Sequence, residues 1–337
     1  MKVDRRKFLG NGISALGALA TVGAGFPRFA QAASDDASSF PSQPIRLIVG
    51  APPGGSNDIV ARLLSERLTA RFKQSVVVEN RPGASGARAA EDVTRQPADG
   101  YTLLMANVAT HAINPILLPD STFNPKRDSM PVAMVGTIRN ILVVTPSLTV
   151  HSVADLIAYA KAHPHKLNFG SAGTGGSVHL AGELFKLRTG VDIVHVPYRG
   201  SGPMVTDLMA GVVQLAFDNF PSSIGAVKAG SLHALAVTSS QRWPLYPSLP
   251  TMEEAGVPNF DITTWFGITA RSGTPQPIID KLSSAITGII GEPDFVQHLA
   301  ALGAVPFKLS PAAFSAFLDK EHVRWKEIID GAHVKIS

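Results

Sequence analysis

The chain of 337 residues contains no cysteine, which excludes disulfide bonds, thiolate metal ligands and thiol catalysis. It also lacks the G-x-S-x-G nucleophile elbow, the G-x-x-x-x-G-K-[ST] phosphate loop and the H-E-x-x-H zinc motif. No apolar run after residue 32 is long enough to cross a bilayer, so we expect no membrane insertion of the mature chain. Without a catalytic signature, we expect a protein that is not an enzyme and needs neither a metal nor a cofactor.

A strong charge of one sign is absent as well once the N-terminus is set aside. Of the 30 basic and 26 acidic residues, five basic and one acidic lie within residues 1–32, which leaves 25 of each in the remainder. These six are Lys2, Asp4, Arg5, Arg6, Lys7 and Arg28. A chain without net charge does not attract phosphate backbones, so nucleic acid is not an expected partner.

Residues 1–32 have the pattern of an export signal. A basic start precedes a Gly- and Ala-rich apolar segment, residues 10–26, and Ala30-Gln31-Ala32 matches an A-x-A cleavage site. The run Asp4-Arg5-Arg6-Lys7-Phe8-Leu9 resembles the bacterial twin-arginine motif, although general secretory signals also contain adjacent arginines. We therefore expect cleavage after Ala32, delivery to the periplasm, and a polar leader over residues 33–43.

The most informative stretch runs from Pro44 to Phe72. A short apolar segment, Ile45–Val49, predicts a buried parallel strand, which ends at Gly50-Ala51-Pro52-Pro53-Gly54-Gly55. Ser56 or Asn57 is expected to cap the following helix, with Asp58 in its positive first turn. Backbone N–H groups at such a helix start favour an anion, and the loop contains no Lys or Arg. A tight turn without a ligand is the alternative interpretation.

The same arrangement recurs in the middle of the chain. A strand at 167–169 leads into Gly170-Ser171-Ala172-Gly173-Thr174-Gly175-Gly176-Ser177, again without Lys or Arg, and a helix is expected from Val178 to about Arg188. A weaker third copy combines a strand at 193–196, a glycine turn at 197–202 and a helix at 204–209. Such alternation predicts an α/β protein with mostly parallel sheets, and the length favours two lobes over one.

Other polar residues follow predicted strands, at the edge where α/β proteins bind ligands. Asn107, Thr110 and His111 come after a strand at 101–105 and form a second candidate rim loop. His179 lies in the first turn of the second glycine-loop helix, where it either contacts a ligand or faces solvent. Asp218 closes a strand at 213–217, where it either orients a ligand or caps a turn.

Nine short motifs occur together along the chain. They are Pro52-Pro53-Gly54-Gly55 with Asp58, Val78–Gly83, Asp99–Leu104, Thr110–Pro115, Leu167–Ser171, His179–Phe185, Val194–Gly200, Leu235–Thr238 and Trp265–Gly267. In this order they resemble the tripartite tricarboxylate transporter substrate-binding family, the Bug-type periplasmic receptors. The resemblance covers about nine tenths of the mature chain.

The resemblance implies a two-lobed, type II-like periplasmic binding-protein fold that closes on a small mono- or dicarboxylate. With the strand pattern, it places lobe 1 at residues 40–141 plus 241–337 and lobe 2 at residues 142–240. It also implies that the ligand passes to membrane subunits of a tripartite tricarboxylate transporter, or to a sensor kinase. The family usually has an aromatic residue at the Ala51 position and often a proline at Gly50, which predicts a roomier pocket in this chain.

In the family, loops matching residues 52–57 and 171–177 hold the ligand through backbone amides, small hydroxyls and water. With the rim residues, the expected ligand-binding set is Pro53, Gly54, Gly55, Ser56, Asn57, Asn107, Thr110, His111, Ser171, Thr174, Gly175, Gly176, Ser177, His179 and Asp218. An exported α/β hydrolase is the alternative function. It would use Ser171 or Ser177 as nucleophile beside His179 and Asp218 at the interlobe cleft.

Overall fold

The computed structural model describes residues 39–243 and 245–334. The expected export signal, its cleavage site after Ala32 and residues 33–38 of the expected leader lie outside these described residues. The strands are β1 (Ile45–Val49), β2 (Val76–Asn80), β3 (Thr102–Asn107), β4 (Ser129–Val144), β5 (Leu167–Ser171), β6 (Ile193–Pro197), β7 (Leu215–Asn219), β8 (His233–Val237), β9 (Thr263–Arg271) and β10 (Ala304–Pro306).

Helices alternate with these strands through most of the chain. The longer ones are α2 (Ser56–Phe72), α3 (Ala87–Thr94), α6 (Val153–Ala162), α7 (Ser177–Thr189), α8 (Ser201–Met209), α9 (Phe220–Lys228), α10 (Gln276–Ile289), α11 (Pro293–Ala301) and α12 (Pro311–Gly331). Short helical turns are η1 (Ala84–Gly86), η2 (Ala109–Ile113), α4 (Asn114–Leu117) and α5 (Pro125–Asp128). Helix α9 and the helical form of η2 have no counterpart among the elements predicted from the sequence.

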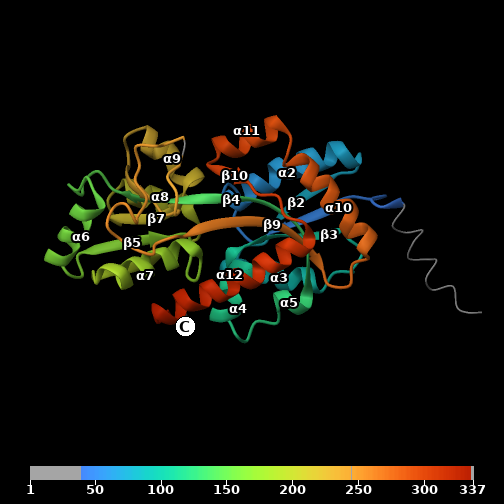
Figure 1. The fold of residues 1–337 in the computed structure, drawn as a ribbon, viewed down its shortest axis with the longest axis horizontal. Helices are drawn as coiled ribbons and strands as arrows, with labels where there is room; N and C mark the ends of the chain where they lie inside the picture. The colour runs from blue at the N-terminus through green and yellow to red at the C-terminus, as the bar shows by residue number, and fades with distance from the viewer. Residues whose placement is uncertain (1–38, 244, 335–337) are drawn as a thin grey trace, which may run out of the picture.

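The strands join into one mixed sheet that serves two lobes (Figure 1). Its order is β2-β1-β3-β9-β4-β7-β5-β6, with β8 and β10 also paired to β4. β1 is parallel to β2 and β3 in lobe 1, and β5 is parallel to β6 and β7 in lobe 2. The predicted parallel pairing is present at both ends, whereas the centre is antiparallel because β9 returns the chain against β4.

Strand β4 connects the two lobes. Its residues from Ser129 to Arg139 pair with β9, and those from Asn140 to Val144 pair with β7. Figure 1 shows β4 and β9 side by side through the middle of the molecule, with the lobes at either end. Asn140 therefore stands where the sheet passes from one lobe to the other.

Helices cover both faces of the sheet in each lobe. In lobe 1, α2 and α10 pack on one face, with Leu64 in their shared core, and α3 covers the other face with Ala89. In lobe 2, α7 buries Phe185 on one face, while α8 and α9 bury Leu208 and Phe220 on the other. Each of these leucine and phenylalanine side chains contributes roughly 1.5–3 kcal/mol when fully buried. This packing fixes where each helix begins relative to the strand before it.

Packing around residues 243 and 260 indicates where the chain passes back from lobe 2 to lobe 1. Trp243 lies in the lobe 2 core with Phe220, and the rings of Phe260 and Phe217 are 5.7 Å apart between centroids. We propose that the chain returns to lobe 1 along β9 rather than at residue 241. Helix α12 contacts β4, η2 and α7, so it packs against both lobes.

The two glycine-loop helices begin close to their predicted starts, but the residues at their N-cap positions are not the predicted ones. Helix α2 starts at Ser56 and α7 at Ser177, and the capping positions are Gly55 and Gly176, both extended. Within the described part of the chain, no side chain caps either helix. The expected cap at Ser56 or Asn57 is therefore wrong, because both residues are already helical. Without a side-chain cap, the first-turn N–H groups keep no partner within the helix.

Candidate functional site

A cavity of about 150 Å³ lies where the N-termini of α2 and α7 meet, and we call it the interlobe cleft. Lobe 1 lines it with Gly50–Pro52, Gly55–Asn57, Ser85 and Asn107–Ala109. Lobe 2 contributes 172–173, Gly176–Val178, Gly200, Ser201 and Asn219, and β9 contributes Thr264 and Phe266. No Lys or Arg is among these residues. The volume lies below the range of about 300–1,000 Å³ for drug-sized ligands, so the cleft fits a small ligand.

Asp58 holds the N-terminus of α2 in place. Its Oδ2 accepts hydrogen bonds from Gly54 N and Arg62 Nε, both at 2.9 Å, and its Oδ1 accepts one from Asn80 Nδ2 at 2.9 Å. Burial acts to raise the pKa of Asp58, but the bonds from Arg62, Gly54 and Asn80 together hold that pKa below its usual value. Asp58 is thus an ionised, paired anchor of the first glycine loop.

His179 supports the second glycine loop from behind. Its Nδ1 accepts a hydrogen bond from Gly175 N at 3.1 Å, and its ring stacks on His195 with the centroids 3.9 Å apart. His195 Nε2 lies 2.7 Å from Ser171 Oγ at the start of the loop. Burial lowers the pKa of His179 and of His195 to about 4. Both rings are therefore neutral near pH 7, as the acceptor role of His179 Nδ1 requires.

A chain of hydroxyl and amide groups forms the floor of the interlobe cleft. Ser177 Oγ lies 2.9 Å from Thr264 Oγ1, which is 3.3 Å from Asn140 Oδ1 and 3.2 Å from Asn219 Oδ1. Asn140 is fully buried, and its Nδ2 has no partner among the described residues. The network joins the start of α7 to both strands that cross between the lobes.

Two further helices start at the cleft, α8 at Ser201 and α9 after its N-cap Asn219. Asp218 ties these two helix starts together. It is fully buried and accepts hydrogen bonds from Ser201 Oγ at 2.8 Å and Ser223 Oγ at 2.5 Å. Burial raises the pKa of Asp218 to about 6, although both hydroxyls act to lower it. Asp218 therefore does not line the cleft itself, but it orients the hydroxyl of Ser201, which does.

The lobes contact each other directly across the cleft. Ser85 Oγ donates a hydrogen bond to Thr174 O at 2.6 Å, and Ser56 Oγ lies 3.5 Å from Ser222 Oγ. Gly200 comes so close to Pro52 that a Cβ atom on it would lie 3.3 Å from Pro52 Cγ. The structure therefore has the lobes together, with the cleft between them.

The structure brings six of the predicted site residues together around the cleft. They are Gly55, Ser56, Asn57, Asn107, Gly176 and Ser177. Nine others do not line it: Pro53, Gly54, Thr110, His111, Ser171, Thr174, Gly175, His179 and Asp218. Several of these support lining residues instead, since the N–H groups of Gly54 and Gly175 are already bonded to Asp58 and His179.

The predicted rim residues at the end of β3 and just after it, Asn107 and His111, separate in the structure. Asn107 lines the cleft, whereas His111 lines a different cavity together with Ser129. His111 Nδ1 lies 2.9 Å from Thr110 Oγ1, and His111 Nε2 lies 3.2 Å from Ser129 Oγ. Burial lowers the pKa of His111 to about 3, so the ring is neutral. His111, predicted to contact a ligand, does not line the interlobe cleft, because η2 is helical and turns that side chain toward Ser129.

Gly50 and Ala51, the two positions where the sequence predicts a roomier pocket, both line the interlobe cleft. Ala51 lines the cleft, where an aromatic side chain would occupy space. A Cβ atom on Gly50 would lie 2.7 Å from Gly86 Cα, so that glycine serves close packing of two loops. The small residue at position 50 therefore reflects contact with Gly86 as well as with the cleft.

Sequence reasoning missed Ser85, Ser201, Asn219 and Thr264 as cleft residues. Ser201 had a local signal, because it lies in the glycine turn of the third strand–turn–helix copy. Asn219 directly follows the candidate Asp218. No local sequence signal marks Ser85 or Thr264, since each reaches the cleft through contacts with residues far away in the sequence.

The hydrolase arrangement is not assembled among the described residues. Ser171 Oγ is bonded to His195 Nε2, His179 Nδ1 accepts from Gly175 N, and Asp218 accepts from two serine hydroxyls. No hydrogen bond joins Ser171 or Ser177 to His179, or His179 to Asp218, within that part of the chain. The residues expected to form a triad instead each hold a different loop or helix start.

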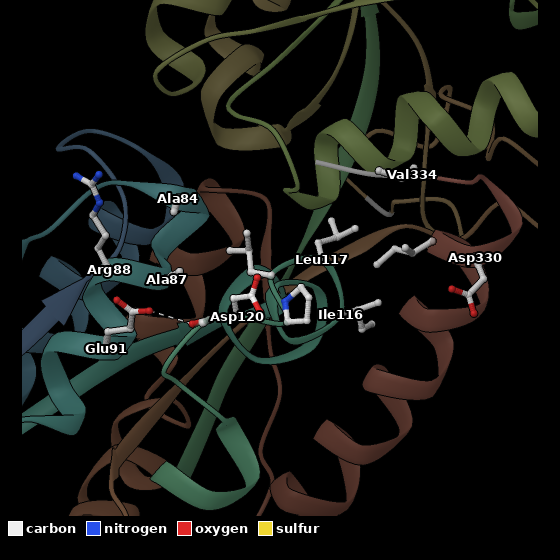
Figure 2. A pocket seen from close by; sticks show the side chains of 13 residues that line it. Ala84, Ala87, Arg88, Glu91, Ile116, Leu117, Asp120, Asp330 and Val334 are labelled. Atoms are coloured by element: carbon white, nitrogen blue, oxygen red, sulfur yellow. Dashed lines mark hydrogen bonds between the residues drawn. The ribbon is translucent and has the colours of Figure 1, made fainter. Parts of the chain in front are cut away.

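A larger cavity of about 700 Å³ lies elsewhere, between α3, residues 116–121 and the end of α12 (Figure 2). Figure 2 shows Arg88 and Glu91 on one side and Asp330 and Val334 on the other. Glu91 Oε1 accepts a hydrogen bond from Ser121 Oγ at 3.0 Å. With Glu91, Asp120 and Asp330 opposed only by Arg88, this cavity disfavours an anion despite its greater size.

Two other features are absent from residues 39–243 and 245–334, namely a metal-binding cluster and a membrane-spanning helix. That part of the chain holds no group of three His, Asp or Glu side chains placed to bind a metal ion. None of its helices has the length and apolar character that crossing a membrane requires.

Comparisons with known proteins point to one group. A family model described as "Tripartite tricarboxylate transporter family receptor" matches residues 60–334. Protein BugT of Bordetella pertussis is 38% identical over 320 residues, which cover 95% of this chain and 98% of BugT. The structure of R. palustris Rpa4515 with adipate has a TM-score of 0.86 at 39% identity, covering 88% of this chain and 99% of that one. MatC (Rpa3494) from Rhodopseudomonas palustris with bound malate has a TM-score of 0.81 at 29% identity, covering 86% and 100%.

Proposed function

Because the chain belongs to the tripartite tricarboxylate transporter receptor family, we propose that it is a periplasmic receptor that captures a small mono- or dicarboxylate in the interlobe cleft. The family resemblance and the two-lobed α/β fold predicted from the sequence are both confirmed. The observation that carries the proposal is the meeting of the α2 and α7 N-termini, from opposite lobes, in a cleft that no described Lys or Arg lines.

Helix N-termini are suited to hold a carboxylate. Each presents unpaired N–H groups and about half a positive charge. In this protein, Ser56 and Asn57 begin α2 while Ser177 and Val178 begin α7, and all four line the cleft. A buried Lys or Arg would lose several kcal/mol of hydration each time the lobes closed without ligand. Neutral amide donors avoid most of that loss, so they favour both capture and release.

We assign direct contact with the ligand to the lining members of the predicted set, namely Gly55, Ser56, Asn57, Asn107, Gly176 and Ser177. Asn57 Oδ1 is buried and lacks a hydrogen-bond partner among the described residues, so it is free to meet a donor on the ligand or a water. Gly54, Gly175 and His179 act behind this lining by fixing the two loops.

The ligand class and the destination follow from the relatives. Rpa4515 was solved with adipate and MatC with malate, which supports a small carboxylate as the ligand of this chain. We propose that the closed, loaded receptor passes it to membrane subunits of a tripartite tricarboxylate transporter, or to a sensor kinase. Lobe closure around β4 and β9 would give those partners a surface that exists only with ligand bound. Small-angle scattering should then show a more compact particle with ligand, and identical profiles would contradict closure.

A thermal-shift screen of small mono- and dicarboxylates tests the proposed function. A ligand at 100-fold over its Kd should stabilise the protein by about 2.7 kcal/mol. Native mass spectrometry of protein purified without refolding gives an independent readout, because a tightly held carboxylate appears as added mass. An ester-hydrolysis assay on the same sample tests the hydrolase alternative. Turnover without any carboxylate binding would overturn the receptor proposal.

A further inference from the structure

The wall of the interlobe cleft contains a hydroxyl group, Ser201 Oγ, whose proton already forms a hydrogen bond with Asp218. We propose that Ser201 Oγ accepts a hydrogen bond from the bound carboxylate, so that ligands carrying a hydroxyl or amino group are preferred over unsubstituted ones. This inference rests on the proposed function and names the class of carboxylate that the receptor selects.

The direction of one hydrogen bond carries the argument. Ser201 Oγ lies 2.8 Å from Asp218 Oδ1, and an ionised carboxylate can only accept, so the Ser201 proton points at Asp218. Ser201 lines the cleft and is 8% exposed. The hydroxyl oxygen of Ser201 can therefore only accept a hydrogen bond from a ligand. A C–H group of the ligand at that place would leave the acceptor unpaired, whereas an O–H or N–H group would satisfy it.

The other cleft hydroxyls among the described residues do not direct their protons at a charged group. Thr264 Oγ1 donates to the side-chain oxygens of Asn140 and Asn219, so Ser177 Oγ donates its proton to Thr264 Oγ1, a neutral hydroxyl. Ser56 Oγ lies near Ser222 Oγ, and in that pair either oxygen can be the donor. Ser85 does donate its proton to Thr174 O, but that bond closes the edge between the lobes and is exposed. Among the described cleft residues, Ser201 alone has its proton directed at a buried carboxylate.

The charge distribution supports the same orientation of the ligand. Asp58 at the start of α2 is balanced by Arg62 Nε at 2.9 Å, and α7 has no acidic residue in its first turn. Asp218 lies beneath the starts of α8 and α9, and no described Lys, Arg or His forms an ion pair with it. Its charge offsets the positive ends of those two helices. A carboxylate is thus directed to α2 and α7, and the donor of the ligand faces Ser201.

Malate and succinate form a matched pair of probes, because they have the same carbon chain and differ by one hydroxyl. At a pH well above 6, where Asp218 is ionised, titration calorimetry should show malate binding at least about tenfold more tightly than succinate, the effect of roughly one good hydrogen bond. Aspartate, which carries an ammonium group instead, should also bind more tightly than succinate. Equal affinities, or tighter binding of succinate, would overturn the inference.

Two serine variants separate recognition from structural support. Ser201→Ala removes the acceptor and one bond to Asp218, and it should weaken malate about tenfold while changing succinate little. Ser223→Ala removes the other bond to Asp218, but Ser223 does not line the cleft. Ser223→Ala should therefore keep the malate preference even if the protein melts earlier. Loss of that preference in Ser223→Ala, or its survival in a folded Ser201→Ala protein, would show that Ser201 only supports the fold.

The outcomes for this inference and for the proposed function are distinct. If succinate binds and malate has no advantage, the receptor function stands and the role of Ser201 is refuted. If no small carboxylate binds at any concentration tested while the protein is folded, the proposed function fails and the inference fails with it.

Discussion

Replacing Gly176 by valine should block the interlobe cleft without disturbing the fold around it. Gly176 is the N-cap of α7, with φ −86° and ψ 166°, so its backbone conformation suits any residue. The nearest heavy atom to a Cβ atom there is Gly173 O at 3.9 Å. The three added carbons therefore enter the cleft, whose volume is about 150 Å³, and cover the first N–H groups of α7.

The expected loss of affinity follows from those amides. A ligand carboxylate separated from its N–H donors leaves polar groups without partners, which costs about 1–3 kcal/mol. That corresponds to a loss of about five- to 150-fold in Kd. Titration calorimetry with the carboxylate from the thermal-shift screen measures this. The N-cap change also removes about 1 kcal/mol or less of stability, so urea unfolding should confirm that the variant is folded.

A matched control is Gly225→Val, because a Cβ atom at Gly225 in α9 meets nothing within 4 Å and the residue lies outside the cleft. It should bind like the parent. Gly175→Val is unsuitable as a probe, since Gly175 has φ +78° and a β-branched residue is strained there. If folded Gly176→Val binds as tightly as Gly225→Val, the ligand does not approach the start of α7 and the reasoning is refuted.

Three other changes test separate parts of the account. Ser177→Ala removes the contact with Thr264 Oγ1 at 2.9 Å and should weaken binding by about 1 kcal/mol in calorimetry; no change would exclude that hydroxyl from recognition. Burial lowers the pKa of His111 from 6.5 to about 3, so the unfolded state binds a proton first as the pH falls, and the free energy of unfolding drops by about 2 kcal/mol between pH 6.5 and pH 5. In urea unfolding, His111→Asn should reduce this pH dependence of stability, and an unchanged dependence would refute the assignment. Replacing Arg5 and Arg6 by Lys should abolish export if the twin-arginine route is used, and an unchanged periplasmic yield would exclude that route.

The local arrangement of strand, glycine loop and helix was predictable from sequence because its signals are local. Ile45–Val49 is short and apolar except for Arg46, two prolines and paired glycines end it, and the buried face of the helix follows at once. The capping residue was not predictable in this way. Ser56 has the composition of an N-cap, but Gly55 takes that position and Asp58 bonds back to Gly54 N.

The composition of the cleft wall depends on contacts that no local pattern records. Thr264 meets Ser177 across 87 residues of sequence, and Ser85 meets Thr174 across 89. His111 shows the converse, because a polar residue after a strand is expected at the ligand edge, yet η2 turns it toward Ser129. A sequence therefore indicates which loops reach the strand ends, while side-chain direction there is decided by tertiary packing.

A crystal structure of the protein with the carboxylate that gives the largest thermal shift tests the central claim most directly. The account predicts that the carboxylate lies in the interlobe cleft, with its oxygens within hydrogen-bond distance of the amides that begin α2 at Ser56 and α7 at Ser177. A carboxylate bound instead in the larger cavity beside α12 (Figure 2), with none in the cleft, would contradict it.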